Sequence, residues 1–231
     1  MLALQADLFS NLDGADDDFE VAADVAFERI ELDARCWVDV ARGWLRGADG
    51  ICEALARQVG WRQRRRRMYD RVVDEPRLTR WYPAGTALPH PALPAFRSAM
   101  VARYGAPFGP LGLNYYRDGH DSVAPHRDRE LRHLDDTIVA ILTFGARRPF
   151  PIHPLGGGRS IDIRPGSGDV LVMGGACQLL WEHAVPKVAA AGPRISASIR
   201  WAARPPAARV PVTPPSHDGR HGPTHHWPTL L

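Results

Sequence analysis

Residues 114–130 read NYYRDGHDSVAPHRDRE, and this stretch holds the most informative residues of the chain. It begins in a β-type run, Leu113–Tyr116, and carries His126 and Asp128 two positions apart. Residues i and i+2 of a strand point to the same face, so an imidazole and a carboxylate placed there can reach one metal ion. The stretch therefore predicts a metal site carried by a β-sheet.

Similar short runs of β-forming residues continue toward the C-terminus, separated by turn residues. The runs that share this pattern are Leu113–Tyr116, Thr137–Phe144, Phe150–His153, Ser160–Ile163, Asp169–Met173 and Arg194–Trp201. Three consecutive glycines, at 156–158, separate two of these runs, as expected in a hairpin. The spacing predicts an antiparallel barrel or sandwich.

The first half of the chain has helix signals. Apolar residues recur at helical spacing in the segments 33–45, 49–59 and 91–104. Asp33 and Asp49 are placed to cap the first two helices. Helices followed by many short strands predict an α+β fold that is mainly β.

A second histidine and two arginines complete the set of candidate site residues. His183 follows an apolar strand, and Arg194 and Arg200 lie on one face of the last strand. Two imidazoles and a carboxylate form a facial triad, which leaves adjacent metal positions open and is typical of non-haem Fe(II) oxygenases. A guanidinium beyond the triad suits the far carboxylate of a bidentate keto acid. The order of these groups favours an oxygenase over scattered polar residues.

Basic charge is concentrated in one region. The chain has 28 Arg and one Lys, and residues 57–80 carry nine Arg against three acids, including the run Arg64, Arg65, Arg66 and Arg67. A genome rich in G and C accounts for a general preference for Arg. The concentration predicts a phosphate-binding surface, with a solvated basic helix end as the alternative.

Composition excludes several classes of protein. With 231 residues, 45% of them hydrophobic, the chain can bury a core and is not a wholly disordered protein. No run approaches about 18 apolar residues, and no secretory signal is visible, so we expect no membrane association. Cys36, Cys52 and Cys177 do not form a disulfide framework or a cysteine zinc site, and we expect a cytoplasmic location.

Taken together, the motifs resemble those of AlkB-type nucleic-acid dealkylases, a family of Fe(II)- and 2-oxoglutarate-dependent dioxygenases. The resemblance lies in residues 114–130, 168–183 and 194–200, and extends with less specificity over 60–203. It implies a double-stranded β-helix, or jelly roll, preceded by a helical and extended segment that recognises the nucleotide.

The resemblance also implies roles for individual residues. The residues that match the iron ligands, and so the catalytic group, are His126, Asp128 and His183. The residues that match contacts to the co-substrate 2-oxoglutarate are Asn114, Tyr116, Arg194, Ser198 and Arg200. In this comparison Arg194 lies near the metal-chelating end and Arg200 pairs with the distal carboxylate. Glu130 matches an acid that approaches the polar edge of the damaged base.

The part that would stack the flipped base is matched less closely. Residues 77–82 resemble the segment that supplies a stacking aromatic, and we expect Tyr82 in that role, with Trp81 as second choice. The alternative for either residue is a packing aromatic of the core. Arg64–67 complete the expected substrate-binding residues.

The implied function is oxidative demethylation or dealkylation repair of N-alkylated bases in DNA, with RNA left open. Fe(II), 2-oxoglutarate and O₂ would be required, and succinate, CO₂ and an aldehyde released. We expect nucleic acid as the partner and a monomeric protein. Two alternatives remain: a dioxygenase of the same chemistry that acts on a protein, lipid or small molecule, and a non-catalytic jelly-roll binding module.

Four regions are expected along the chain. Residues 1–32 form an acidic, partly disordered lead-in, and 33–110 form the N-terminal helical and nucleotide-recognition region. Residues 111–204 form the jelly-roll catalytic core, and 205–231 form a disordered tail rich in Pro and His.

Overall fold

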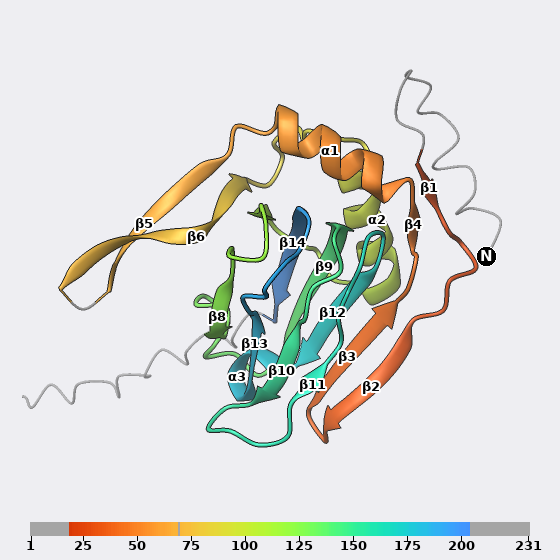
Figure 1. Ribbon diagram of the computed structural model, residues 1–231. Helices are drawn as coiled ribbons and strands as arrows, with labels where there is room; N and C mark the ends of the chain where they lie inside the picture. The colour runs from red at the N-terminus through yellow and green to blue at the C-terminus, as the bar shows by residue number, and fades with distance from the viewer. Residues whose placement is uncertain (1–18, 69, 204–231) are drawn as a thin grey trace, which may run out of the picture.

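The computed structural model describes residues 19–68 and 70–203 (Figure 1). In chain order the elements are β1 Glu20–Val21, β2 Glu28–Asp33, β3 Cys36–Ala41, β4 Leu45–Arg46, α1 Ala48–Gln58, β5 Arg62–Met68, β6 Arg71–Tyr82, α2 Ala92–Tyr104, β7 Leu111–Tyr116, β8 Val123–His126, β9 Thr137–Gly145, β10 Pro151–Pro154, β11 Ile161–Asp162, β12 Val170–Gly175, α3 Cys177–Leu180, β13 Trp181–Val185 and β14 Arg194–Ala202. The predicted tail, 205–231, and residues 1–18 of the predicted lead-in lie outside the described residues. Residues 19–32 contain β1 and most of β2.

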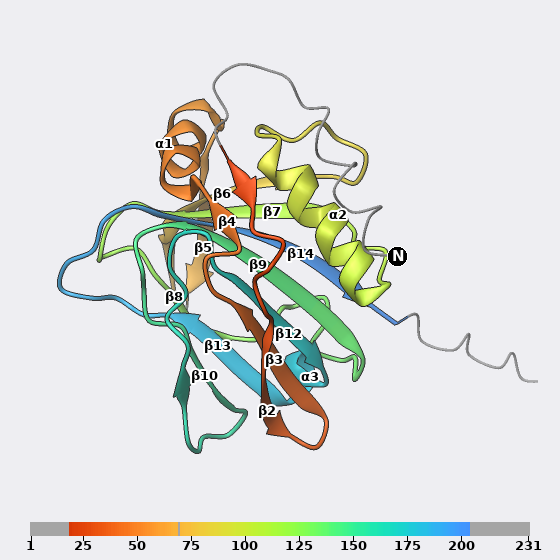
Figure 2. The same cartoon turned by 90° about the vertical axis from the view of Figure 1, so that its right-hand side faces the viewer.

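Two antiparallel sheets make up the body of the protein. The large sheet has the order β2-β3-β12-β9-β14-β7-β6-β5, and the small sheet has the order β11-β10-β13-β8. The views in Figures 1 and 2 show β8, β10 and β13 facing the central strands of the large sheet. The mainly β, jelly-roll prediction is confirmed, and the six predicted strands match β7, β9, β10, β11, β12 and β14 to within two residues.

Strand β9 shows why the core forms on both faces of the large sheet. Successive side chains of a strand point to opposite faces, and every residue from Thr137 to Phe144 is buried. Leu142 and Phe144 pack into the cluster beneath the helices, whereas Val139 and Ile141 pack toward the small sheet. A strand covered on both sides reads as a continuous apolar run.

Two of the predicted helices are confirmed, and they cover the outer face of the large sheet (Figure 2). Helix α1 buries Ile51 and Leu55 in the same cluster as Phe96 of α2. Asp49 is in the first turn of α1, and the N-cap is Gly47, which lies two residues before the predicted cap. Helix α2 ends at Gly105, whose φ of 64° is the left-handed conformation that favours glycine.

The helix predicted over residues 33–45 is wrong, because this segment forms the end of β2, then β3 and β4. Trp37 and Ala41 contact one core cluster, and Val38 and Val40 belong to the other. Strand β3 is therefore covered on both faces, and its dense apolar residues coincide with helical spacing. It pairs with β12 from Cys36 opposite Gly175 onward.

Strands β5 and β6 form a long hairpin that leaves the edge of the large sheet (Figure 1). The run of four arginines, 64–67, lies on β5, so it is extended and is not a helix end. β6 joins the hairpin to the sheet through its pairing with β7.

None of the helices in residues 19–68 and 70–203 has the length and apolar character of a membrane span.

Candidate metal centre and its cavity

The register of the large sheet places residues from four neighbouring strands in rows on its inner face. One row consists of Trp81, Gly112, Ser198 and Ile141, and the next consists of Thr79, Asn114, Ser196 and Thr143. All of these residues except Thr143 line a cavity of about 310 Å³, which also contains Arg194 and Arg200 from the same strand. On the opposite side, His126 and His183 of the small sheet, with Phe150 just before β10, line the same cavity.

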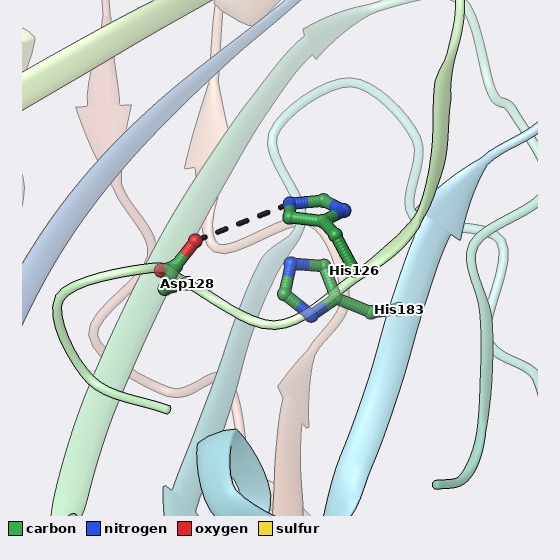
Figure 3. A group of neighbouring side chains, drawn as sticks. All are labelled: His126, Asp128 and His183. Carbon is green, nitrogen blue, oxygen red and sulfur yellow. Dashed lines mark ion pairs between the residues drawn. The ribbon is translucent and has the colours of Figure 1, made fainter. Parts of the chain in front are cut away.

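Three predicted metal ligands meet at one end of this cavity (Figure 3). His126 ends β8 and lies directly opposite His183 on β13, so their rings are 4.3 Å apart between centroids. Asp128 joins them, and the ligand atoms of the three residues all lie within 4.8 Å of one another. This is the 2-His-1-carboxylate set that leaves open positions on an Fe(II) ion.

Asp128 does not share a strand with His126. β8 ends at His126, and Asp128 lies two residues beyond it in a loop. The alternation of a strand therefore does not aim the carboxylate, and other contacts must do so. The two side chains lie close together as expected, but not because they share the face of one strand.

Two side chains hold Asp128. Arg200 donates from Nε to Asp128 Oδ2 at 2.6 Å, and the backbone N–H of Asp128 donates to Gln178 Oε1 at 2.8 Å. Burial alone would raise the pKa of Asp128, but the charge of Arg200 and its hydrogen bond outweigh burial and lower it. The carboxylate is therefore charged at neutral pH and held by Arg200, while Gln178 holds the backbone of the same residue.

Both imidazoles present a nitrogen lone pair. His126 Nδ1 is 2.9 Å from the carbonyl oxygen of Ala124, which accepts a hydrogen bond when Nδ1 carries the proton. Nε2 is then free as a ligand and lies 4.0 Å from Asp128 Oδ1. Burial, followed by the neighbouring His126, lowers the pKa of His183 to about 3, so His183 is neutral. Phe150 stacks against the His183 ring at 5.5 Å.

A second charged group lies deeper in the cavity. Arg194 is 1% exposed, and its side chain donates a hydrogen bond from Nη2 to Thr143 Oγ1 at 3.3 Å. Its Nε and Nη1 are buried without a partner among the described residues. Burial lowers the pKa of this guanidinium, and Tyr116 lies 5.4 Å beneath it. A buried cation with two free donors fits an anionic group such as a carboxylate.

The two arginines occupy the reverse of their expected positions. We expected Arg194 near the metal and Arg200 at the distal carboxylate. Arg200 instead touches the metal ligand Asp128, while Arg194 lies opposite Tyr116, six residues along β14. The six-residue spacing predicts that both arginines lie on one face of the strand. Only the contact with Asp128 shows which of the two is nearer the metal ligands.

Asn114 and Ser198 line the cavity as expected. Asn114 Oδ1 accepts a hydrogen bond from Arg77 Nε at 3.3 Å. Ser198 Oγ donates to the carbonyl oxygen of Gly112 and accepts from Arg200 Nη1, each at 3.3 Å. Both side chains are thus oriented by neighbours in the same sheet.

Of the two candidate stacking aromatics, the structure places the second choice, Trp81, at the cavity. Trp81 lines the cavity and is 45% exposed, whereas Tyr82 is partly buried against the main core cluster. The alternation of β6 explains this outcome, because adjacent residues face opposite sides of the sheet. Trp81 shares its face with Thr79 and Arg77, which also line the cavity.

Of the other expected substrate residues, some line the cavity and some do not. Glu130 lines the mouth of the cavity, 3.4 Å from Arg200 Nε. Of the arginines in the run, Arg64 reaches the cavity, and Arg65 lies 3.5 Å from Asp74 on the hairpin. Arg67 is exposed, and the side chain of Arg66 is outside the described part.

Three residues of the site carried no assigned role in the sequence. Gln178 holds the loop with Asp128, Phe150 stacks on a ligand, and Arg77 contacts Asn114. Gln178 and Arg77 lie inside the motif segments, but the identity of an amino acid does not reveal which residue it contacts in the fold. Phe150 belongs to a predicted strand, yet only the fold brings that strand to β13.

The fold and this centre define a protein of the Fe(II)- and 2-oxoglutarate-dependent oxygenase class. A family model described as the 2OG-Fe(II) oxygenase superfamily matches residues 55–213, and the chain belongs to that superfamily. Within it, the chain is similar to proteins named alpha-ketoglutarate-dependent dioxygenase alkB homolog 3, which confirms the resemblance to AlkB-type dioxygenases.

The alkB homolog 3 of Rattus norvegicus is 34% identical over 163 residues, which cover 62% of this chain and 55% of the rat protein. The Homo sapiens protein is also 34% identical over 163 residues, covering 61% of this chain and 56% of its own. The chain thus spans a little over half the length of these relatives.

Two solved structures show more remote similarity. A 2OG-Fe(II) oxygenase family oxidoreductase from Burkholderia pseudomallei is 16% identical, with a TM-score of 0.46, over 66% of this chain and 77% of that chain. A Pseudomonas putida prolyl-4-hydroxylase is 18% identical, with a TM-score of 0.44, over 67% and 83%.

The residues present fit both groups that the superfamily implies. The two imidazoles and the charged carboxylate suit Fe(II), and the unpartnered donors of Arg194 suit the distal carboxylate of 2-oxoglutarate. Asn114 and Ser196 form the next pair along the wall of the same cavity, and Tyr116 lies opposite Arg194.

Proposed function

We propose that this chain removes alkyl groups from base nitrogens of nucleic acid by an Fe(II)- and 2-oxoglutarate-dependent oxidation. One observation carries the proposal. A single cavity is lined by the three candidate metal ligands, by the buried Arg194 with its two unpartnered donors, and by Trp81, Glu130 and Arg64. The resemblance to AlkB-type dealkylases supports the same chemistry.

His126, Asp128 and His183 would hold Fe(II), and Arg194 would bind the distal carboxylate of 2-oxoglutarate. When bound, Fe(II) with 2-oxoglutarate and O₂ supplies the oxidation of an alkyl C–H bond, with release of succinate and CO₂. The hydroxylated N-alkyl group then separates as an aldehyde and restores the base. The role of the protein is to orient the two substrates and to exclude water.

Arg200 has a positioning role in this scheme. It donates to both oxygens of Asp128, at 2.6 and 3.4 Å, and lies 3.4 Å from Glu130. One guanidinium therefore links the metal ligand to the acid at the mouth of the cavity. Glu130 is 57% exposed on its side chain, so it is accessible to the polar edge of a base.

Trp81 and the hairpin β5–β6 provide the contacts that a nucleic acid needs. A target base must leave its stack to enter the cavity, and stacking on an aromatic ring contributes about 1–3 kcal/mol toward that cost. Trp81 offers an exposed ring at the cavity wall. Arg64, Arg65 and Arg67 lie on the adjoining strand, where they can contact phosphates without reading sequence.

The second candidate is a dioxygenase of the same chemistry that acts on a protein or small molecule. The basic hairpin distinguishes the two, because a neutral small substrate needs no such surface. Substitution of Arg64, Arg65 and Arg67 by Gln should weaken single-stranded oligonucleotide binding and flatten its salt dependence. Each lost phosphate contact should lower the log–log salt slope by about 0.7.

Coupled turnover gives the direct test. The iron-loaded protein is supplied with 2-oxoglutarate and an oligonucleotide that contains one N1-methyladenine, and succinate and formaldehyde are measured. The proposal predicts equal amounts of both products, and loss of both in His183→Ala. If the oligonucleotide yields no formaldehyde while succinate still forms, the chemistry is right and the substrate class is wrong.

A further inference from the structure

Gly112 lies between two residues of the cavity wall. On β7 it is paired with Trp81 of β6 on one side and with Ser198 of β14 on the other. A Cβ atom at this position would be 3.3 Å from two carbons of the Trp81 ring and 3.4 Å from Ser198 Oγ. The absence of a side chain is therefore what lets the indole lie against the backbone of β7.

We infer that Gly112 is a positioning residue for substrate: it sets the depth at which the Trp81 ring lies in the cavity. The inference rests on the proposed function, in which the target base stacks on the Trp81 ring in the cavity. Gly112 does not itself touch a reacting atom, and it acts through Trp81.

The packing around Trp81 supports this role. The side chain is 45% exposed, so the core does not hold it in place. Its ring rests instead on the cross-strand glycine, an arrangement that fixes an aromatic side chain at little entropic cost. Any side chain at 112 must move the ring by a few tenths of an ångström or more.

Hydrogen bonds also connect this contact to the metal centre. Arg200 Nη1 donates to Ser198 Oγ, which donates to the carbonyl oxygen of Gly112. The same arginine holds Asp128. Ser198 and Arg200 of β14 therefore connect the glycine beneath the indole to the metal ligand Asp128. Such a connection would help to keep a base on the indole oriented toward the metal.

A double-mutant cycle tests the inference. The proteins are the parent, Gly112→Ala, Trp81→Ala and the double variant, with Gly50→Ala as control because a Cβ at Gly50 meets nothing within 4 Å. We measure kcat and KM for the N1-methyladenine oligonucleotide, and the dissociation constant of 2-oxoglutarate in the iron-loaded protein.

Trp81→Ala should raise the oligonucleotide KM about 5- to 150-fold, the equivalent of one stacking contact. Gly112→Ala should raise it about 3- to 10-fold, and by less than about twofold once Trp81 is absent. The affinity for 2-oxoglutarate should stay within about twofold throughout. An equal rise in KM on the Trp81→Ala background, or no rise at all, would overturn the inference.

A stability cycle separates this result from failure of the proposed function. Gly112→Ala should lower the melting temperature in the parent and leave it unchanged in Trp81→Ala, because the contact exists without substrate. If the parent does not turn over the oligonucleotide, the proposed function fails. A coupled stability effect would then still support the contact, and an uncoupled one would overturn it as well.

Discussion

Replacement of Arg148 by Met should destabilise the protein more than any single surface substitution. Arg148 lies between β9 and β10, is 1% exposed, and donates to the carbonyl oxygens of Asp118, Asp121 and Pro186 at 2.8, 3.0 and 2.8 Å. These acceptors belong to the loop before β8 and to the residue that follows β13. One side chain thus joins the two strands that carry the histidine ligands.

The magnitude follows from these three bonds. A hydrogen bond from a charged donor contributes about 1.5–3 kcal/mol, so the gross interaction is roughly 4.5–9 kcal/mol. The buried guanidinium also has a desolvation cost, which lowers its pKa and offsets part of this gain. A net loss of about 3–5 kcal/mol is expected, a large part of the ~5–15 kcal/mol typical of a folded domain.

Urea denaturation measures the effect, with Arg147→Met as the matched control. Arg147 is the adjacent residue, 59% exposed on its side chain, and its nearest carboxylate, Asp169, is 3.6 Å away. Its replacement should cost less than about 1 kcal/mol. Arg148→Met should also release Fe(II) more readily. Equal unfolding free energies for the two variants would refute the reasoning.

Three further predictions concern other contacts. Gln178→Leu should weaken Fe(II) binding about 10-fold or more in a competition titration with a chelator, because it removes the acceptor of the Asp128 N–H. Arg194→Met should raise the KM for 2-oxoglutarate by at least about 10-fold, since a charged hydrogen bond contributes 1.5–3 kcal/mol, and leave iron affinity within about twofold. Burial alone would raise the pKa of Asp121, but the hydrogen bonds and charge of Arg117 outweigh it and lower the pKa. Its ion pair therefore contributes stability above about pH 4 and loses it as the pH falls, so the difference in urea midpoint between Asp121→Asn and the parent should shrink below pH 4.

The metal centre was predictable because its parts appear in a fixed order along the chain. A strand that ends at His126, Asp128 just beyond it, further strands and then His183 bring the three residues together, with the two histidines on neighbouring strands of the small sheet. The sequence did not reveal what aims Asp128, because Gln178 and Arg200 are 50 and 72 residues away. Contacts at that separation depend on the complete fold.

The errors have related causes. Strand β3 looked helical because apolar residues on both of its faces happened to recur at helical spacing. The choice of Tyr82 over Trp81 depended on which face of β6 points inward, and a shift of one residue reverses that answer. The pairing of Trp81 with Gly112 fixes the register, and no local signal in the sequence does so.

The central claim is tested most directly by the mass of the base. The anaerobically iron-loaded protein is given 2-oxoglutarate, O₂ and an oligonucleotide with one N1-methyladenine, and the base is then analysed by mass spectrometry. Our account predicts loss of one CH₂ from the base, abolished in both His126→Ala and Asp128→Ala. A methyl group that survives while wild-type protein consumes 2-oxoglutarate, or that is lost equally with the Asp128→Ala variant, would contradict it.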